Sequence, residues 1–432
     1  MKIAVFGAGY VGLVTGACFS EMGNNVIITD IDSDKIGKLN TGIVPLFEPG
    51  LPDMIRKNHS EDRLIFTTSA EMAIEESDII FITVDTPSRE DGSTDLTSIN
   101  NVAEEIGRCI SSYKIIVVKS TVPPGTNEHI RKIIANFSKG SVKFDMVSNP
   151  EFLQEGSAIQ NFMTPDRIII GTDSDKAREV TNDLYEGISR TENPIMNTSI
   201  SNSEIVKYAS NAMLAMRISF MNQIAPLCEV FGADIKEVAK GMGYDDRIGS
   251  RFLHAGIGFG GSCLKKDVLS ISNQLTKNNL DNSIMRDILE VNERQKTYLI
   301  QKVKNALGNV SGKRIALWGL SYKPNTNDLR SAPSVFIASA LLELGAEISA
   351  YDPEAMENMR KTFPEIEYCQ DPYSCAKGSD AIILITEWSI FRNLDFRMIL
   401  KEMKTPVIVD GRNIYDKLDM TNIGFRYYGI GR

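Results

Sequence analysis

A cysteine at the end of a glycine-rich loop is the residue of this sequence best suited to act as a nucleophile. Residues 258–263 read Gly-Phe-Gly-Gly-Ser-Cys and a helical pattern follows them, so Ser262 is predicted to be the helix N-cap. A helix N-terminus and nearby lysines favour the thiolate, which is the form that attacks carbonyl carbon. Asp267 lies one helical turn after Cys263, where a carboxylate is placed to activate water. The spacing by itself leaves a buried structural cysteine as the alternative interpretation.

A lysine and an asparagine in a helical pattern form a second candidate for chemistry. Lys207 and Asn211 are four residues apart, so a helix presents an ammonium group and an amide on one face. The pair is suited to hold a reacting oxygen. A solvated lysine beside a surface asparagine has the same spacing, so the pair by itself leaves both interpretations open.

A glycine-rich turn near the N-terminus predicts a dinucleotide site. Residues 7–12 read Gly-Ala-Gly-Tyr-Val-Gly between a strand pattern and a helical pattern, which is the context that gives this motif weight. Its glycines permit a tight turn and close approach of the backbone to a pyrophosphate, which the helix N-terminus stabilises. Asp30 closes the next strand, where an acid accepts a hydrogen bond from a ribose 2′-hydroxyl and repels a 2′-phosphate. The pattern therefore predicts NAD rather than NADP.

Two patterns in which strands alternate with helices position these residues. In the first part of the chain, apolar strands are expected at 3–6, 25–29, 78–84, 114–119, 145–148 and 167–171. Their continuous β-branched character is typical of strands that are buried on both faces of a parallel sheet. In the last part of the chain a second set is expected at 314–319, 347–350, 381–386 and 406–409.

Long helices are expected between the two sheets, because apolar residues recur at helical spacing through 203–231 and 283–307. The sequence therefore predicts an α/β protein with two doubly wound Rossmann-like domains joined by a long-helix central region. The expected parts are an NAD-binding domain at 1–200, a central region with the cysteine loop at 201–307, and a second Rossmann-like domain at 308–432.

Composition excludes several classes of function. The 432 residues include 47 Lys and Arg against 56 Asp and Glu, and this net charge of −9 argues against general affinity for nucleic acids or anionic membranes. The start of the chain carries no secretion signal and no apolar stretch of membrane-spanning length, so a cytoplasmic location is expected. The six cysteines are scattered without C-x-x-C spacing, which suits a reducing compartment and predicts no metal site.

Several further motifs, in one consistent order along the chain, carry a resemblance to a known family. Together with the glycine turn they are the segments at 120–123, 149–156, 204–211, 247–249, 258–267 and 322–330. These motifs resemble the UDP-glucose/GDP-mannose dehydrogenase family, and within it the UDP-glucose 6-dehydrogenase branch. The resemblance spans nearly the whole chain, so chance interpretations of the single motifs are set aside.

The resemblance implies oxidation of UDP-glucose to UDP-glucuronate with two NAD⁺. In the family the half-oxidised sugar is held on a cysteine as a thiohemiacetal, becomes a thioester, and is released by water. By resemblance the catalytic residues are Cys263, Lys207, Asn211, Asp267, Thr121 and Glu151. The cysteine is the nucleophile, the lysine and asparagine steady the oxyanion, and the other three handle protons and water.

The resemblance also implies two sets of binding residues and a homodimer built through the first long helix. The expected contacts to the UDP-sugar are Phe152, Leu153, Gln154, Glu155, Lys207, Asn211, Arg247, Phe252, Leu253, His254, Ala255, Gly256, Gly260, Lys323 and Arg412. The expected contacts to NAD are Gly7, Gly9, Tyr10, Val11, Gly12, Asp30, Lys35, Thr86, Thr121, Glu155, Lys266 and Arg330. In the dimer, Arg247 is expected to reach the substrate of the partner subunit.

Three residues depart from the family's usual pattern. Asp85 occupies a position at which the family commonly has glycine, and His254 one at which lysine is frequent. Lys265 occupies the second position after Cys263, at which the family often has proline. Asp85 adds negative charge near the cofactor, and His254 predicts that nucleotide binding depends on pH near 6.5. None of the three removes a catalytic group.

Three other functions fit parts of the pattern. The same four-electron chemistry could act on GDP-mannose or a UDP-N-acetylhexosamine. A two-electron hydroxyacid dehydrogenase also uses a dinucleotide domain with a helix-borne lysine and asparagine, but it needs no cysteine. A sensor that binds NAD or a sugar nucleotide without catalysis needs no nucleophile either, so Cys263 argues against both of these.

Overall fold

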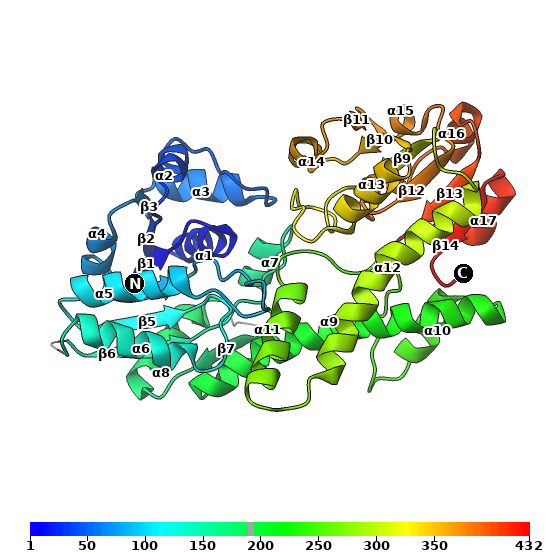
Figure 1. Cartoon of the computed structure of the whole chain (residues 1–432). Helices are drawn as coiled ribbons and strands as arrows, with labels where there is room; N and C mark the ends of the chain where they lie inside the picture. The colour runs from blue at the N-terminus through cyan, green and yellow to red at the C-terminus, as the bar shows by residue number, and fades with distance from the viewer. Residues whose placement is uncertain (141, 189–193) are drawn as a thin grey trace. The chain divides into compact units, whose positions relative to one another are not determined.

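The computed structural model describes residues 1–140, 142–188 and 194–432, which form two compact units (Figure 1). The first unit comprises Met1–Ser210 and the second Asn211–Arg432. The long helix α9 (Ile200–Phe231) runs through the boundary and begins three residues before the predicted start. Residues 211–307 belong to the same unit as the C-terminal sheet.

The described part of the first unit contains an eight-stranded sheet in the order β3-β2-β1-β4-β5-β6-β7-β8. Its strands are β1 (Lys2–Phe6), β2 (Asn25–Thr29), β3 (Leu64–Thr67), β4 (Ile79–Ile82), β5 (Lys114–Val118), β6 (Phe144–Ser148), β7 (Ile168–Gly171) and β8 (Ile195–Thr198). The order of the first six is that of doubly wound dinucleotide-binding folds, so the predicted fold class is confirmed here.

Two details of this sheet differ from the prediction. The pairing of β6 with β7 is antiparallel, whereas the other neighbouring strands are parallel. The sequence analysis also missed β3 and β8, which lie at the two edges of the sheet. Both strands are only four residues long and expose residues in mid-strand, so their sequences carry little strand signal.

Helices cover both faces of the first sheet. They are α1 (Tyr10–Glu21), α2 (Ser33–Asn40), α3 (Leu51–Ser60), α4 (Ala70–Glu75), α5 (Thr97–Cys109), α6 (Thr126–Phe137), α7 (Ala158–Met163) and α8 (Asp175–Glu186). Alternate strand residues supply the two core layers. Val5 and Phe81 pack with α1, α3 and α7 on one face, and Ala4 and Ile80 pack with α4, α5 and α6 on the other.

The second unit, all of whose residues are described, contains a six-stranded parallel sheet in the order β11-β10-β9-β12-β13-β14. Its strands are β9 (Arg314–Trp318), β10 (Glu347–Tyr351), β11 (Glu367–Tyr368), β12 (Ala381–Leu384), β13 (Val407–Asp410) and β14 (Arg426–Gly429). This order repeats the doubly wound pattern, which confirms the second Rossmann-like sheet.

The second unit also contains further helices. They are α10 (Ile235–Gly243), α11 (Leu264–Lys277), α12 (Ser283–Leu307), α13 (Pro333–Glu343), α14 (Met356–Thr362), α15 (Pro372–Ala376), α16 (Phe396–Glu402) and α17 (Lys417–Ile423), with a 3₁₀ turn at Ser389–Phe391. The bounds of α12 are those predicted. Among the helices that the structure describes, none combines the length and the apolar character needed to cross a membrane.

The fold places the predicted residues of the first unit after the carboxyl ends of its central strands. The glycine turn follows β1, Thr121 lies in the loop after β5, and Glu151 lies in the loop after β6. Ligands of doubly wound sheets bind at this edge.

Candidate active site

The turn after β1 has the shape of a pyrophosphate cradle. Gly7 has a φ of +105°, and a Cβ on Gly12 would lie 1.8 Å from the carbonyl oxygen of Gly7. A Cβ on Gly9 would meet no atom within 4 Å, so the space beside this residue is open. Gly9 is also the N-cap of α1, which Tyr10 and Val11 begin. The open turn and the unpaired N–H groups of the first helical turn fit a dinucleotide phosphate.

Asp30 connects the end of β2 to this turn. Its Oδ2 accepts hydrogen bonds from the Ala8 N–H at 2.7 Å and from Lys35 Nζ at 3.0 Å, and its Oδ1 accepts one from the Asp32 N–H at 3.0 Å. Burial raises the pKa of Asp30, but these hydrogen bonds outweigh burial and hold the pKa below its usual value. An ionised carboxylate here fits a ribose hydroxyl and disfavours a 2′-phosphate.

Glu48, which the sequence analysis missed, ties the predicted substrate loop to the start of α1. Its buried carboxylate accepts hydrogen bonds from the N–H groups of Gly156 at 2.6 Å and Ala158 at 2.8 Å. The Tyr10 hydroxyl bonds to Glu48 and lies 3.0 Å from the Gly156 nitrogen. Tyr10, predicted to contact the cofactor, therefore also fixes the loop at 152–156. Sequence spacing gives no signal for such distant partners.

Lys207 and Glu151 form a buried ion pair in the first unit. The Nζ lies 3.1 Å from Oε1, and the side chains are 5% and 8% exposed. The other carboxylate oxygen accepts from the Leu153 N–H at 2.5 Å. Lys207 and Arg167 both lie over the ring of Phe152, at 5.1 and 3.8 Å from its centroid. Three predicted residues, Lys207, Phe152 and Leu153, are thus brought together around the Glu151 carboxylate.

The other predicted residues of this unit lie in loops. The Thr86 hydroxyl donates to the carbonyl oxygen of Thr121 at 2.9 Å, which joins the loops after β4 and β5. The exposed Gln154 donates its N–H to Asn161 at 2.9 Å. Glu155 is half-buried beside it.

Cys263 is exposed and is itself the N-cap of α11. Its carbonyl accepts the N–H of Asp267 at 2.9 Å, which makes it the first residue to join the helical hydrogen bonds. Ser262, predicted to be the N-cap, lies one residue earlier, and its hydroxyl is 3.5 Å from the Cys263 sulfur. The N-cap prediction is therefore wrong by one residue, and the thiol stands at the helix terminus.

Asp267 organises two further predicted residues of the second unit. The residue is fully buried; its Oδ2 accepts from Asn211 Nδ2 at 2.6 Å and its Oδ1 from Lys266 Nζ at 2.7 Å. Each carboxylate oxygen has a second lone pair, so Asp267 can also accept a hydrogen bond from water. This network lies one helical turn after Cys263.

Close approach of two loops explains the glycines that precede the cysteine. A Cβ on Gly260 would lie 2.9 Å from the Tyr322 Cβ, and one on Gly261 would lie 2.7 Å from the Tyr322 ring. The Arg412 guanidinium donates to the carbonyl oxygen of Gly258 at 3.0 Å. Gly260 and Arg412, both predicted substrate contacts, therefore hold the cysteine loop against the residues that follow β9.

Two predicted arginines lie on the surface of the second unit. The Arg247 side chain is 89% exposed and pairs with Asp245 at 2.6 Å. Arg330 pairs with Asp328 at 2.8 Å. Lys323 is half-buried, with its Nζ 5.8 Å from the centroid of the neighbouring tyrosine ring.

The residues that depart from the family pattern have little effect on the described contacts. Asp85 is exposed, and Lys265 pairs with Glu293 at 2.9 Å. Although His254 reaches solvent, partial burial of its ring lowers its pKa below 6.5, so the predicted pH dependence belongs at lower pH. The rest of its loop is partly or fully buried: Phe252, Leu253, Ala255 and Gly256.

Three models of a single family match this chain in order. They are the NAD binding domain at residues 1–189, the central domain at 201–294 and the UDP binding domain at 316–417 of the UDP-glucose/GDP-mannose dehydrogenase family. The chain belongs to this family. Membership confirms the predictions of a dehydrogenase and of NAD as its cofactor.

Relatives in the UDP-glucose/GDP-mannose dehydrogenase family match over the full length. The chain is 44% identical to a UDP-glucose 6-dehydrogenase of Rhizobium meliloti (strain 1021), with 100% of both chains covered. It is 43% identical to UDP-glucose 6-dehydrogenase TuaD of Bacillus subtilis (strain 168), covering 100% of this chain and 93% of the relative. A solved UDP-glucose dehydrogenase of Pyrobaculum islandicum is 36% identical with a TM-score of 0.92, covering 99% and 97%.

One further acidic residue in a family motif has a structural role that the sequence analysis missed. Glu204 on α9 accepts hydrogen bonds from the N–H groups of Gly125 at 2.7 Å and Asn127 at 2.9 Å. A carboxylate at the start of α6 satisfies N–H groups that lack helical partners. It therefore anchors α9, and with it Lys207, to the loop after β5.

Proposed function

We propose that this protein oxidises UDP-glucose to UDP-glucuronate with two NAD⁺ and a covalent intermediate on Cys263. The observation that carries the proposal is the exposed thiol at the N-terminus of α11, one turn before a buried carboxylate bonded to Asn211 and Lys266. A two-electron dehydrogenase or a sensor has no use for this arrangement. Full-length relatives that carry the UDP-glucose name support the choice of sugar over GDP-mannose and UDP-N-acetylhexosamines.

Each proposed residue has a task that follows from its chemistry. Bound NAD⁺ supplies the hydride acceptor for both oxidations. Lys207 and Asn211 donate to the oxygen on C6 of the sugar, which stabilises negative charge as the proton leaves. The Cys263 thiolate adds to the aldehyde carbon, and the same sulfur leaves when water attacks the thioester. Asp267 and Glu151 accept protons at their carboxylate oxygens, and Asp267 orients the Asn211 amide.

Counting NADH per UDP-glucose tests the proposal. Two NADH per sugar are expected from the wild type, whereas one would indicate a two-electron dehydrogenase and none a sensor. Cys263→Ala should lose the second NADH, because no thioester forms. The matched control is Cys109→Ala, a half-buried cysteine of the first unit, which should keep both. Parallel assays with GDP-mannose and a UDP-N-acetylhexosamine would assign the sugar.

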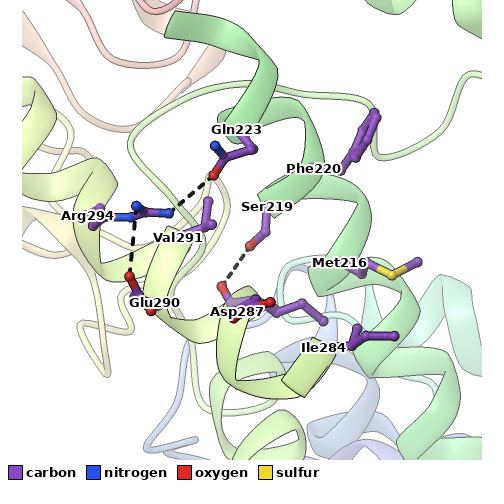
Figure 2. A pocket seen from close by; sticks show the side chains of 10 residues that line it. Met216, Ser219, Phe220, Gln223, Ile284, Asp287, Glu290, Val291 and Arg294 are labelled. Carbon is purple, nitrogen blue, oxygen red and sulfur yellow. Dashed lines mark hydrogen bonds and ion pairs between the residues drawn. The ribbon is translucent and has the colours of Figure 1, made fainter. Parts of the chain in front are cut away.

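The proposal includes a homodimer formed through α9. Met213, Phe220 and Leu227 follow one another at seven-residue spacing and are 52%, 49% and 53% exposed, which makes an apolar stripe typical of helix pairing. Figure 2 shows Met216 and Phe220 of α9 and Ile284 of α12 lining one groove. The volume of this groove is about 410 Å³. A second copy would cover this stripe. In the dimer we expect the exposed Arg247 to reach the substrate of the partner by exchanging its ion pair with Asp245 for the ligand.

Light scattering tests the dimer. The wild type should have twice the mass of one chain, and a Met213→Glu, Phe220→Glu double variant should have the mass of one. Leu418→Glu, at a leucine of the second unit that is 68% exposed, is the control that should stay dimeric. A monomeric wild type would refute the dimer. We also place the protein in the cytoplasm, where its six free cysteines stay reduced.

A further inference from the structure

Lys119 is a buried cation to which the proposed mechanism gives no task. It is the first residue after β5, 5% exposed, and sits between the rings of Phe162 and Tyr185, each centroid 5.9 Å from Nζ. Its Nζ donates to Asn149 Oδ1 at 3.1 Å and to the Tyr185 hydroxyl at 3.4 Å, both neutral groups. A buried ammonium is costly, so its presence calls for a compensating role.

The contacts of Lys119 lead directly to Glu151. Asn149 lies two residues before Glu151, and its amide is fixed on three sides. Its Oδ1 accepts from the Tyr185 hydroxyl at 2.5 Å as well as from Lys119, and its Nδ2 donates to the Ile169 carbonyl at 2.8 Å. Lys119 therefore pins the segment that carries the carboxylate. Pro150 between them further limits how that segment can move.

Charge also links Lys119 to the ion pair. The carboxylate of Glu151 and the ammonium of Lys207 both act electrostatically on Lys119. Glu151 therefore attracts two cations, and the three groups together carry one net positive charge when both lysines are protonated. A pair of Lys207 and Glu151 by itself would be neutral.

We propose that Lys119 is a positioning residue of the dehydrogenase, which shares Glu151 with Lys207 and so leaves the Lys207 ammonium able to stabilise the sugar oxyanion. This inference rests on the proposed function. Removing the Lys119 charge would bind Lys207 more fully to Glu151 and take one positive charge away from the reacting oxygen. At an effective dielectric constant near 20, removing a unit charge at a distance on the order of 8 Å from a developing negative charge slows a reaction by roughly thirtyfold, and we take this general figure as the expected size of the effect.

The role predicts a fall in activity on the alkaline side. Burial lowers the pKa of Lys119 to about 8, with Glu151 raising it and Lys207 lowering it further. Of the other titratable groups around it, burial raises the pKa of Cys18 to about 12 and that of Tyr185 above its usual value, so both stay neutral. Arg167, in the lining of the same small cavity, stays charged. Loss of the Lys119 proton above pH 8 should therefore slow turnover.

Three variants separate charge from packing. Lys119→Met fills the same space without charge, and Lys119→Arg keeps a charge that does not titrate in this range. The control Lys114→Met removes a second buried lysine from the opposite end of β5, where Nζ bonds to backbone carbonyls. For each, kcat and KM would be measured with NAD⁺ and UDP-glucose from pH 6 to pH 10.

Expected results differ for each variant. Lys119→Met should lower kcat about thirtyfold at pH 7 with little change in the KM for NAD⁺, and its alkaline limb near pH 8 should vanish. Lys119→Arg should retain most of the activity and move that limb up by at least one pH unit. Lys114→Met should keep the wild-type profile.

Several outcomes would overturn the role of Lys119 while leaving the proposed function intact. They are a wild type that makes two NADH per sugar but shows no alkaline limb, and a Lys119→Met enzyme with wild-type kcat and limb. If Lys119→Met does not fold, the role is still refuted by a Lys119→Arg variant in which kcat falls at the same alkaline pH as in the wild type. A wild type that forms no NADH from UDP-glucose would instead refute the proposed function itself.

Discussion

Burial of Lys119 makes a prediction about stability that does not depend on catalysis. A lysine in an unfolded chain has a pKa of 10.5, whereas burial in the first unit lowers the pKa of Lys119 to about 8. Below pH 8 both states hold the proton, and the folded state bears the full cost of the buried charge. Between pH 8 and 10.5 the unfolded state holds more protons, so the free energy of unfolding rises with pH.

The difference between the two pKa values sets the size of the effect. It corresponds to about 3 kcal/mol in total, most of which is recovered between pH 7 and pH 10. Neither Lys119→Met nor Lys119→Arg titrates in this range. The unfolding free energy of the wild type should therefore rise by about 2 to 3 kcal/mol relative to each variant over these three pH units.

Urea unfolding at a series of pH values measures the effect. Far-UV circular dichroism reports both units, whereas tryptophan fluorescence reports the second, because Trp318 and Trp388 both lie there. The rise should appear in the circular dichroism and be absent from the fluorescence of the second unit. A wild-type advantage that stays constant within about 0.5 kcal/mol from pH 7 to pH 10 would show that Lys119 is not a buried titrating cation.

Three other substitutions, together with one control, test separate parts of the site. Asp30→Ala should raise the KM for NAD⁺ by ten- to a hundredfold and reduce the enzyme's preference for NAD⁺ over NADP⁺, because a charge-assisted hydrogen bond is worth about 1.5–3 kcal/mol. If the ratio of kcat/KM for NAD⁺ to kcat/KM for NADP⁺ is the same in the wild type and the variant, this reasoning is wrong. Gly261→Ala combines a φ of +83° with a Cβ 2.7 Å from the Tyr322 ring, so it should cost at least about 2 kcal/mol in urea unfolding. Gly232→Ala has a φ of +68° in open space and should cost about 1 kcal/mol; equal losses would refute the steric argument. Glu48→Ala should release the substrate loop and raise the KM for UDP-glucose about tenfold with a smaller change in kcat, a split that initial-rate kinetics can detect.

The parts of the fold that sequence analysis predicted are those with strong local patterns. Continuous apolar runs such as β4 and β5 mark central strands, and helical periodicity gave the bounds of α12. The edge strands β3 and β8 escaped because one side of an edge strand needs no apolar residues. The antiparallel pairing of β7 escaped because strand direction is set by the connection and not by composition.

Site residues divide along a similar line. Cys263 and Asp267 are four residues apart, as are Lys207 and Asn211, so a local motif predicts them. The N-cap itself was predicted one residue too early. Glu48 and Lys119 act through partners that are distant in sequence, and a buried carboxylate or ammonium looks like a surface residue until its burial is known. A local pattern thus finds the proposed substrate contacts more readily than the residues that hold them in place.

The two Rossmann-like sheets share a strand order, but the aspartate that follows the second strand of this order differs in its burial between them. In the first unit Asp30 is partly exposed and Gly9 leaves open space beside the turn. In the second unit the corresponding Asp352 is fully buried and accepts hydrogen bonds from the N–H groups of Leu320 at 2.6 Å and Ser321 at 3.0 Å.

The indole N–H of Trp388 donates a hydrogen bond of 3.0 Å to Oδ2 of Asp352, and the Ser321 hydroxyl donates to the same oxygen. Asp352 thus has no access to a ribose, and Ser321 fills the place that Gly9 leaves open. One topology therefore yields a dinucleotide site only where the turn is empty and the acid is reachable. In the second unit the same topology has turned its acid inward, so this carboxylate is not accessible to a ligand there.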